Sequence, residues 1–229
     1  MEKIKDLVLI IAAAGSSSRF GIQAKQLELL SGLPVFLHSV KNLSPLAKTT
    51  IIAVPKGKIQ LYMEIAEEYG FKQEELLFVE GGDSRGASVK NALKKAQSII
   101  SEGIVAIHDA ARPLAQPKML LRLVDEARIC GGAAPGKMVS DTLLKTDAEN
   151  IITESVPRKG IWQIATPQVF RFRELLDAYA KLQEADFTDD TQVFMATGGK
   201  VRIIQEDDFN AKITYKCDLD VFRRLLRNQ

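Results

Sequence analysis

The sequence predicts an α/β protein with a mostly parallel central sheet, and two patterns support this prediction. Short apolar runs alternate along the chain with longer stretches whose apolar residues recur at helical spacing. The apolar runs are nearly continuous, which is typical of strands that crossover helices bury on both faces. The 229 residues contain no Pro/Gly-rich linker, low-complexity tract or internal repeat, so we expect a single domain over residues 1–229.

Seven apolar runs are predicted to be strands, and seven stretches are predicted to be helices. The strands are Leu7–Ala14, Thr49–Val54, Leu76–Val79, Ile104–His108, the Ala133–Pro135 region, Gln163–Ala165 and Val201–Ile204. The helices are Val35–Leu43, Ile59–Tyr69, Ser84–Ile100, Pro117–Ile129, Phe172–Gln183, Asp189–Thr197 and a C-terminal helix from Leu219. Their alternation is what a parallel sheet with crossover connections requires.

One segment, residues 140–156, interrupts this alternation. Two β-like runs, Thr142–Thr146 and Ile151–Val156, flank the polar turn Asp147–Asn150. We expect a protruding hairpin arm. Because a lone hairpin is marginally stable in water, it should pack against the same hairpin of a second subunit in a homodimer, or else fold onto its own domain.

Composition and charge exclude several classes of protein. A net charge of +2 gives no support for extended nucleic-acid or membrane binding. Cys130 and Cys217 lie far apart without a Cys-x-x-Cys motif, which argues against a zinc site or a disulfide framework. The N-terminal apolar run is only a strand long and follows charged residues, unlike a signal peptide or membrane span, so we expect a cytoplasmic protein.

The first predicted strand leads into a loop of small residues that suits phosphate binding. Gly15 and the serines at 16–18 allow backbone N–H groups to face an anion, while Arg19 and Lys25 add positive charge. The loop matches neither a P-loop nor a dinucleotide fingerprint. A tight strand-to-helix turn with incidental serines is the alternative.

Polar clusters follow four predicted strands, at residues 15–25, 81–85, 109–113 and 166–168. Since ligands of open parallel sheets bind beyond the carboxyl ends of the strands, we expect these clusters to line one cleft.

Asp109 is the candidate metal ligand of that cleft. A carboxylate at the end of an apolar strand is costly unless it faces solvent, an arginine or a metal. Beside a phosphate loop it suggests Mg²⁺, held mostly by phosphate oxygens and water. The alternative is an ion pair with Arg112 that merely closes the turn. His108 and His38 are expected to be packed and hydrogen-bonded rather than catalytic.

The glycine pair at 81–82 is the candidate nucleobase pocket. Paired glycines permit a flat ring to approach the backbone, and Ser88 would lie one helical turn further on. Helix capping by Asp83 or Ser84 explains much of the same segment without a ligand. Lys212 lies among apolar residues, where burial would require an anionic partner.

The ordered motifs resemble the 2-C-methyl-D-erythritol 4-phosphate cytidylyltransferase family over nearly the whole chain. They are residues 13–19, Lys25-Gln26, residues 81–85, Ser88-Val89, residues 108–113, Asp141-Thr142, residues 166–168, residues 188–190 and residues 212–214. The resemblance implies a Rossmann-like three-layer α/β/α fold, with residues 140–156 as the dimerisation arm. It also implies transfer of CMP from CTP to 2-C-methyl-D-erythritol 4-phosphate in non-mevalonate isoprenoid synthesis. The loop departs from the family in having Ser17 where glycine is frequent and Ala24 where proline is common.

The resemblance also implies roles for individual residues. Arg19 and Lys25 would stabilise the transition state, Arg158 and Lys212 would position the acceptor phosphate, and Asp109 would meet Mg²⁺ or another divalent cation and the acceptor. Further substrate-binding residues implied are Ala13, Ala14, Gly15, Ser16, Gly82, Asp83, Ser88, Ala110, Arg112, Thr142, Thr166 and Thr188. Thr142 and Arg158 would serve the site of the other subunit.

Three other functions remain as alternatives from the sequence. A cytidylyltransferase for ribitol 5-phosphate or another polyol phosphate would differ only in its acceptor pocket. A nucleotide-dependent oxidoreductase would need an acidic ribose ligand after the second strand, where residues 54–57 supply none. A non-catalytic nucleotide-binding regulator would release no pyrophosphate.

Overall fold

The computed structural model describes residues 2–15, 20, 24–182 and 187–227. Its strands are β1 Ile4–Ala12, β2 Leu29–Leu30, β3 Leu33–Pro34, β4 Ala47–Val54, β5 Leu76–Glu80, β6 Ile104–Asp109, β7 Gly132–Met138, β8 Leu143–Thr146, β9 Ile152–Val156, β10 Trp162–Ile164, β11 Gln168–Arg171 and β12 Val201–Gln205. Its α-helices are α1 Val35–Leu43, α2 Ile59–Glu68, α3 Arg85–Gln97, α4 Pro117–Cys130, α5 Phe172–Lys181, α6 Asp190–Ala196 and α7 Asp218–Arg227. The predicted strands and helices are confirmed, with ends shifted by a few residues.

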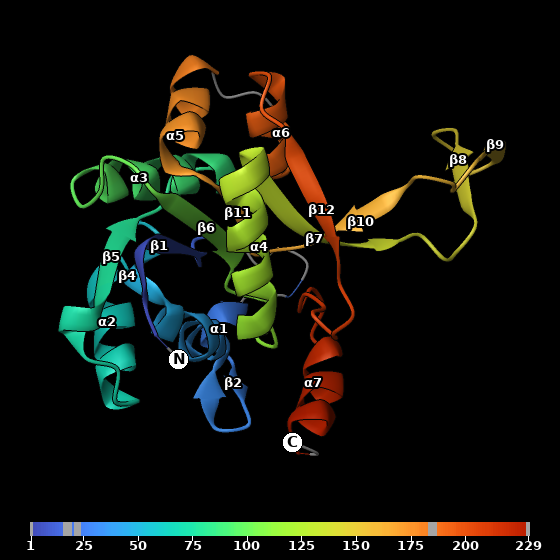
Figure 1. Cartoon of the computed structure of the whole chain (residues 1–229). Helices are drawn as coiled ribbons and strands as arrows, with labels where there is room; N and C mark the ends of the chain where they lie inside the picture. Colours follow the sequence, from blue (N-terminus) through green and yellow to red (C-terminus); the bar gives the residue numbers. More distant parts are fainter. Residues whose placement is uncertain (1, 16–19, 21–23, 183–186, 228–229) are drawn as a thin grey trace.

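An eight-stranded sheet forms the centre of the molecule, in the order β10-β7-β11-β6-β1-β4-β5, with β12 also paired to β7 (Figure 1). β1 is flanked by parallel partners, β4 and β6. The carboxyl ends of β1 and β6 lie side by side, because Ala12 pairs with Asp109. The mostly parallel α/β fold is therefore confirmed.

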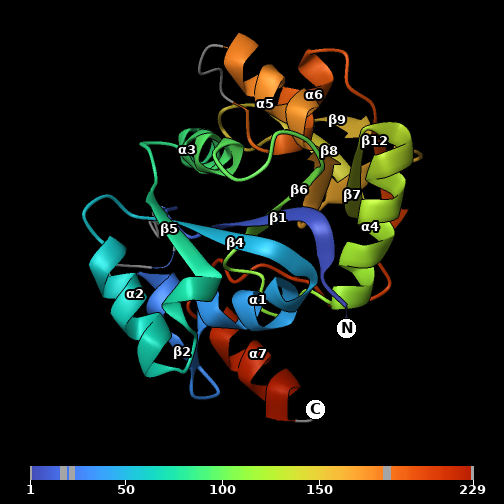
Figure 2. The ribbon, with the colours of Figure 1, turned by 60° about the vertical axis from the view of Figure 1, so that its left-hand side comes forward.

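Helices cover both faces of this sheet and give three layers (Figure 2). Leu7, Leu9 and Ile11 of β1 point into a core shared with α1, α2 and α4. The alternate residues Val8 and Ile10 point into a second core shared with α3, α5 and α6. Because successive strand residues face opposite sides, a strand buried on both faces must be apolar throughout, as the continuous run at 7–11 is.

One strand of the sheet, β11, was not predicted. It runs antiparallel to both of its neighbours, β6 and β7. Its four residues lead directly into α5 at Phe172, so no turn residue separates strand from helix in the sequence. Residues 166–168 follow a strand as predicted, but that strand, β10, is antiparallel to β7, and Gln168 already begins β11. These residues reach the carboxyl end of β6 because an antiparallel strand begins there, and Gln168 pairs with Ile107.

The hairpin at 140–156 projects away from the body of the molecule (Figure 1). β8 and β9 pair with each other around the turn and form a sheet of their own. Asn150 adopts a φ of 63° in that turn, a left-handed conformation that asparagine tolerates better than most residues. The alternative of a hairpin folded onto its own domain does not occur in this structure.

The C-terminal helix α7 packs outside the three layers. Its residues Leu219 and Phe222 share a third apolar cluster with Ile213, Leu30 and Phe20. Through this cluster, the chain that follows Lys212 packs against residues near the end of the predicted phosphate loop and beyond it. Among the described residues, no helix is long and apolar enough to span a bilayer.

Candidate active site

Asp109 is the centre of a cationic cluster at the carboxyl edge of the sheet. Its Oδ1 lies 3.0 Å from Nε of Arg85, and its Oδ2 lies 2.7 Å from Nζ of Lys212. Nε of Arg112 is more distant, at 3.9 Å from Oδ2. Burial alone would raise the pKa of Asp109, but the charges of Arg85 and Lys212 outweigh burial and hold that pKa far below its usual range. Asp109 is therefore ionised at neutral pH. The ion pair with Arg112 that the sequence offered as an alternative is present, but Arg85 and Lys212 are the closer partners.

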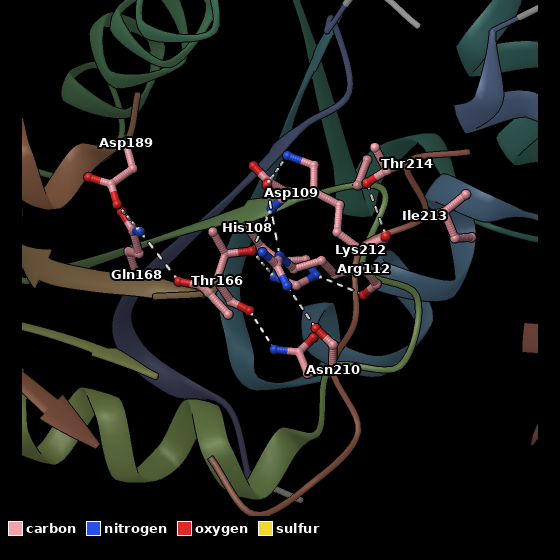
Figure 3. Close-up of polar contacts among 12 residues, drawn as sticks. His108, Asp109, Arg112, Thr166, Gln168, Asp189, Asn210, Lys212, Ile213 and Thr214 are labelled. Carbon is pink, nitrogen blue, oxygen red and sulfur yellow. Dashed lines mark hydrogen bonds and ion pairs between the residues drawn. The ribbon is translucent and has the colours of Figure 1, made fainter. Parts of the chain in front are cut away.

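His108 and Thr166 fix the backbone beneath this carboxylate (Figure 3). Thr166 Oγ1 accepts the backbone N–H of Asp109 at 3.0 Å and lies 3.1 Å from Nδ1 of His108. Nε2 of His108 lies 3.1 Å from the carbonyl oxygen of Arg112. A carbonyl oxygen can only accept, so Nε2 of His108 carries the proton of the neutral ring and donates to it, and Nδ1 accepts the hydroxyl proton of Thr166.

His108 is neutral in this arrangement. Burial lowers its pKa to about 4, despite the opposing charge of Asp109. The side chain has no exposed surface. The prediction that His108 is packed and hydrogen-bonded is thus confirmed, and His38 likewise bonds to the Leu30 carbonyl at 2.7 Å.

Asn210 ties the chain before Lys212 to the same cluster. Its Nδ2 donates to the carbonyl of Thr166 at 2.8 Å, and its own backbone carbonyl accepts Nη1 of Arg112 at 2.8 Å (Figure 3). Two buried atoms here, Nε of Arg112 and Oδ1 of Asn210, have no hydrogen-bond partner among the described residues. Buried polar atoms without partners are costly, so this corner of the site is suited to receive a polar ligand.

Lys25 lies against the chain that carries Lys212. It begins the short 3-10 helix at Lys25–Leu27, and its Nζ donates to the carbonyl of Ile213 at 3.1 Å. The next residue, Gln26, donates to the carbonyl of Gly15 at 3.0 Å, so the described residues at the two ends of the predicted phosphate loop contact each other. The structure therefore brings Lys25 close to Lys212, as the predicted cleft requires. Ser16 and Arg19 lie outside the described residues.

The predicted nucleobase loop packs against the start of the phosphate loop. A Cβ on Gly81 would lie 2.3 Å from the Cβ of Ala14 and 2.7 Å from Oγ of Ser88, so only glycine fits. Gly82 N–H donates to Oγ of Ser88 at 3.0 Å. Ser84 caps α3 by accepting the N–H of Ala87, which confirms the capping role predicted for this segment.

Other predicted residues lie on this edge or close to it. Ala13 and Ala110 are buried, and the N–H of Ala110 donates to the carbonyl of Ala12 at 3.1 Å. Gly15, Gly82 and Asp83 are exposed. Thr188 is exposed just before α6, where its Oγ1 accepts from Gln192 at 3.1 Å.

Thr142 and Arg158 are not brought to Asp109 within this chain. Both are exposed on the arm, on either side of its two strands. Arg158 donates to the carbonyl of Ser140 at the base of the arm. The arm carries these side chains away from the body of their own chain (Figure 1).

Two further members of the cluster, Arg85 and Asp190, were missed by the sequence reasoning. Nη2 of Arg85 donates to Oδ2 of Asp190 at 2.8 Å, and Asp190 is completely buried. Arg85 belongs to the motif at residues 81–85 and Asp190 to the motif at residues 188–190, but neither was assigned a role. Their pairing left no local signal, because 105 residues separate them.

The cluster fits a divalent cation only in a limited way. Within the described ranges, no three His, Cys, Asp or Glu side chains lie close enough together to hold a metal ion. Asp109 is a single carboxylate, and Lys212 and Arg85 already occupy one oxygen each. This suits Mg²⁺ that is bound mainly by phosphate oxygens and water with one carboxylate, rather than a protein-built metal cage.

Comparisons with known proteins agree on one family. The family described as 2-C-methyl-D-erythritol 4-phosphate cytidylyltransferase matches residues 7–228. A protein of that name from Acidobacterium capsulatum is 34% identical, over 96% of this chain and 97% of its own length. The crystal structure of 2-C-methyl-D-erythritol 4-phosphate cytidylyltransferase from Thermus thermophilus is 27% identical, with a TM-score of 0.77, and covers 99% of this chain and 100% of that chain. The structure of 4-diphosphocytidyl-2C-methyl-D-erythritol synthase from Anaerococcus prevotii is 25% identical, with a TM-score of 0.80, over 97% of this chain and 99% of that chain.

Proposed function

The chain belongs to the 2-C-methyl-D-erythritol 4-phosphate cytidylyltransferase family, and we propose on this premise that the cationic cluster around Asp109 is its reaction centre. As a member of that family, it transfers CMP from CTP to 2-C-methyl-D-erythritol 4-phosphate and releases pyrophosphate. The observation that supports the location is that Lys212 and Arg112 lie beside the buried Asp109, while Lys25 contacts the segment that carries Lys212.

The reaction needs charge neutralisation more than proton transfer. A phosphate monoester is already ionised near neutral pH, so its oxygen can attack the α-phosphorus of CTP directly. The bond from that phosphorus to the bridging oxygen of the β-phosphate breaks, and pyrophosphate leaves with the electron pair. Repulsion between the two anions is the obstacle, and fixed positive charges lower it without any reorganisation during the step.

The cations of the site divide into two groups under this proposal. Lys25, and Arg19 as the sequence predicts, would face the triphosphate of CTP, bound at the loop that follows β1. Lys212 and Arg112, with Thr166 and the unpartnered Oδ1 of Asn210, would face the acceptor. The nucleobase would lie over Gly82, Asp83 and Ser88. Their positions on neighbouring strand ends would align the attacking oxygen with the leaving group.

A divalent cation would be held by Asp109 together with the phosphates. When bound, Mg²⁺ supplies positive charge that offsets the charge developing on the phosphate oxygens. Asp109 is suited to this because Arg85 fixes one of its oxygens while the other is shared with the more exposed Lys212.

The arm would complete the acceptor side in a homodimer. Thr142 and Arg158 lie on a hairpin that leaves its own body, and apolar side chains are exposed on the same hairpin, namely Leu144, Ile151 and Ile152. A contact with a second copy would cover them and would place Arg158 at the partner's site. We also propose that the enzyme acts in the cytoplasm.

The decisive experiment measures pyrophosphate release with purified protein, Mg²⁺ and CTP. We expect rapid release with 2-C-methyl-D-erythritol 4-phosphate and much slower release with ribitol 5-phosphate. Replacement of CTP by UTP, ATP or GTP serves as the nucleotide control. Preferred turnover of ribitol 5-phosphate would overturn the acceptor assignment, and absence of pyrophosphate release with every acceptor would overturn the activity.

A further inference from the structure

We propose that Arg85 is a positioning residue that holds Asp109 in place when substrate draws Lys212 away, and that Asp190 and Tyr179 anchor Arg85 for this purpose. The inference rests on the proposed reaction centre. It gives Arg85 a role during the reaction and adds Asp190 and Tyr179, which the proposed mechanism does not use.

The first observation is a chain of short polar contacts that leads inward from Asp109. Arg85 bridges two carboxylates, with Nε on Oδ1 of Asp109 at 3.0 Å and Nη2 on Oδ2 of Asp190 at 2.8 Å. The other oxygen of Asp190 accepts the hydroxyl of Tyr179 at 2.6 Å. The backbone N–H of Asp190 donates to Oε1 of Gln168 at 3.1 Å. The guanidinium of Arg85, which α3 carries, is thus held on the side away from Asp109 by contacts that involve α5, α6 and β11.

The second observation is that the two close cations on Asp109 differ in freedom. The Arg85 side chain is 24% exposed, and its far end contacts a carboxylate that is 0% exposed. The Lys212 side chain is 35% exposed, and among the described residues the bond of its ammonium goes to Asp109 alone. Lysine is a point charge on a flexible stem, whereas the arginine fork is rigid and can bind two carboxylates at once. Lys212 is therefore the partner that an incoming phosphate can take over.

The consequence concerns Oδ2 of Asp109. If Lys212 turns toward an acceptor phosphate, Oδ2 loses its closest cation, and Arg112 at 3.9 Å is too far for a strong hydrogen bond. A carboxylate held by one flexible partner would then rotate or move. Because Arg85 keeps Oδ1 fixed, Oδ2 stays where a metal ion or an acceptor hydroxyl can meet it.

The charges of the cluster agree with this division. Burial alone would lower the pKa of Arg85, but Asp190 and Asp109 outweigh burial and raise that pKa well above its usual value. Burial and the adjacent Asp190 likewise raise the pKa of Tyr179. Arg85 thus remains charged and Tyr179 remains a proton donor throughout the working pH range.

The mildest test is Tyr179→Phe, with Tyr62→Phe as its matched control. Both tyrosines are almost fully buried, so phenylalanine keeps the packing and deletes only a hydroxyl. The Tyr179 hydroxyl anchors Asp190, whereas the Tyr62 hydroxyl has no hydrogen-bond partner among the described residues and lies in the core on the other face of the sheet. We expect Tyr179→Phe to lower kcat by about three- to tenfold without changing KM for CTP, because it perturbs alignment only. Tyr62→Phe should leave both parameters unchanged.

Arg85→Lys and Arg85→Gln give the larger effects. Lysine keeps the charge but cannot span both carboxylates, so we expect kcat to fall by about tenfold with lysine and about a hundredfold with glutamine. CTP affinity, measured by calorimetry without acceptor, should stay within about twofold of wild type. If the role of Arg85 were purely structural, the variants would have a lower melting temperature. At assay temperatures far below that melting temperature, kcat per folded molecule would equal that of wild type.

The outcomes separate this inference from the proposed function. Wild-type protein is assayed first with CTP and 2-C-methyl-D-erythritol 4-phosphate, and absence of pyrophosphate release there refutes the function itself. With an active wild type, equal kcat values for Tyr179→Phe and Tyr62→Phe overturn the positioning role. Full recovery of kcat in Arg85→Lys also overturns it, because charge alone would then suffice.

Discussion

The cluster around Asp109 and the hairpin arm both carry predicted site residues, yet they differ in how their polar groups are satisfied. In the cluster, Asp109, His108 and Thr166 are buried and bonded to one another or to nearby backbone. In the arm, Thr142 and Arg158 are exposed, and their side chains lie on a hairpin whose strands form a sheet of their own. The polar groups around Asp109 are thus held mainly by contacts within the chain, whereas Thr142 and Arg158 are open to solvent.

The arm also exposes apolar side chains to solvent. Leu144, Ile151 and Ile152 of the arm are 46%, 60% and 62% exposed. An isolated hairpin with such side chains gains stability when a second surface covers them. The difference teaches that one fold can preorganise the cations around Asp109, whereas under the proposed dimer the cation on the arm would depend on assembly.

The largest effect is expected from Lys25→Ala, which tests the preorganised half of the site. Loss of one fixed charge contact commonly costs about 10²–10³ in rate, so kcat should fall by that factor while KM for CTP changes little. The same result is expected for Arg19→Ala. Steady-state kinetics measure both constants. Lys48→Ala, an exposed lysine near the start of β4, is the control, and near-normal kcat in Lys25→Ala would remove this residue from the reaction centre.

Lys212→Ala should act on the acceptor rather than on CTP. Its ammonium is the exchangeable partner of Asp109, so we expect KM for the acceptor to rise and kcat to fall, together by about ten- to a hundredfold in kcat/KM. Acceptor titrations at saturating CTP measure this. Lys216→Ala, in the same segment and exposed, should behave as wild type. Unchanged acceptor kinetics in Lys212→Ala would contradict the assignment.

Mixing two inactive variants distinguishes a site shared between subunits from a site within one. If Arg158 serves the partner's site, a heterodimer of Lys25→Ala and Arg158→Ala chains contains one intact site and one doubly defective site. After subunit exchange at equal amounts, about a quarter of wild-type activity should return. If Arg158 serves its own chain, every site lacks one residue and no activity returns. The assay is pyrophosphate release before and after exchange, with each variant alone as control.

Acidification should destabilise the buried cluster through His108. Its pKa is about 4 in the folded chain and 6.5 in an exposed chain, so between these values only the unfolded chain binds the proton. The stabilising effect of a neutral His108 is complete above about pH 6.5, and it is lost as pH falls toward 4, up to about 3 kcal/mol. Burial lowers the pKa of His38 and acts in the same sense. The stabilisation from ionised Asp109 is complete above its ordinary pKa of 3.8 and is lost only below that value, so it does not contribute to the change between pH 7 and 4.

Denaturant titrations between pH 7 and 4 measure this dependence. His108→Gln should flatten the loss of unfolding free energy with falling pH, and His38→Gln should flatten it less, because His38 is only partly buried. An identical pH dependence in wild type and His108→Gln would show that folding does not lower the pKa of His108.

Most of the sheet and helices could be predicted because their signal is local. The apolar run at 7–11 and the helical spacing at 35–43 each determine an element without help from distant residues. β11 could not be predicted, since four residues directly before a helix give no period and no turn. β11 lies between β6 and β7 and is antiparallel to both. Thr166 therefore reaches the cleft because it precedes the start of β11, not because it follows the carboxyl end of a parallel strand.

The site was predictable by position but not by pairing. Polar clusters after β1, β5 and β6 had to meet, because parallel strands end at one edge. Which groups bond there depends on side chains that lie 24 to 105 residues apart, such as Arg85 with Asp109 and Asp190. Asp189 and Asp190 are chemically identical neighbours, yet Asp189 is partly buried and caps α6, whereas Asp190 is fully buried and bonds to Tyr179. The two residues differ only in the direction in which their side chains leave the start of α6.

The smallest effect is expected from the ion pair of the arm, Lys145 with Glu154. Nζ lies 2.7 Å from Oε2, but the side chains are 62% and 55% exposed, so solvent and salt screen the pair. Lys145→Ala should therefore lower the unfolding free energy by less than about 1 kcal/mol, and 0.5 M salt, about three times the physiological ionic strength, should remove the difference. Denaturant titrations at low and high salt measure it. A loss well above that value that persists in high salt would mean that a partner arm buries the pair in solution, and the arm would then resemble the cluster rather than contrast with it.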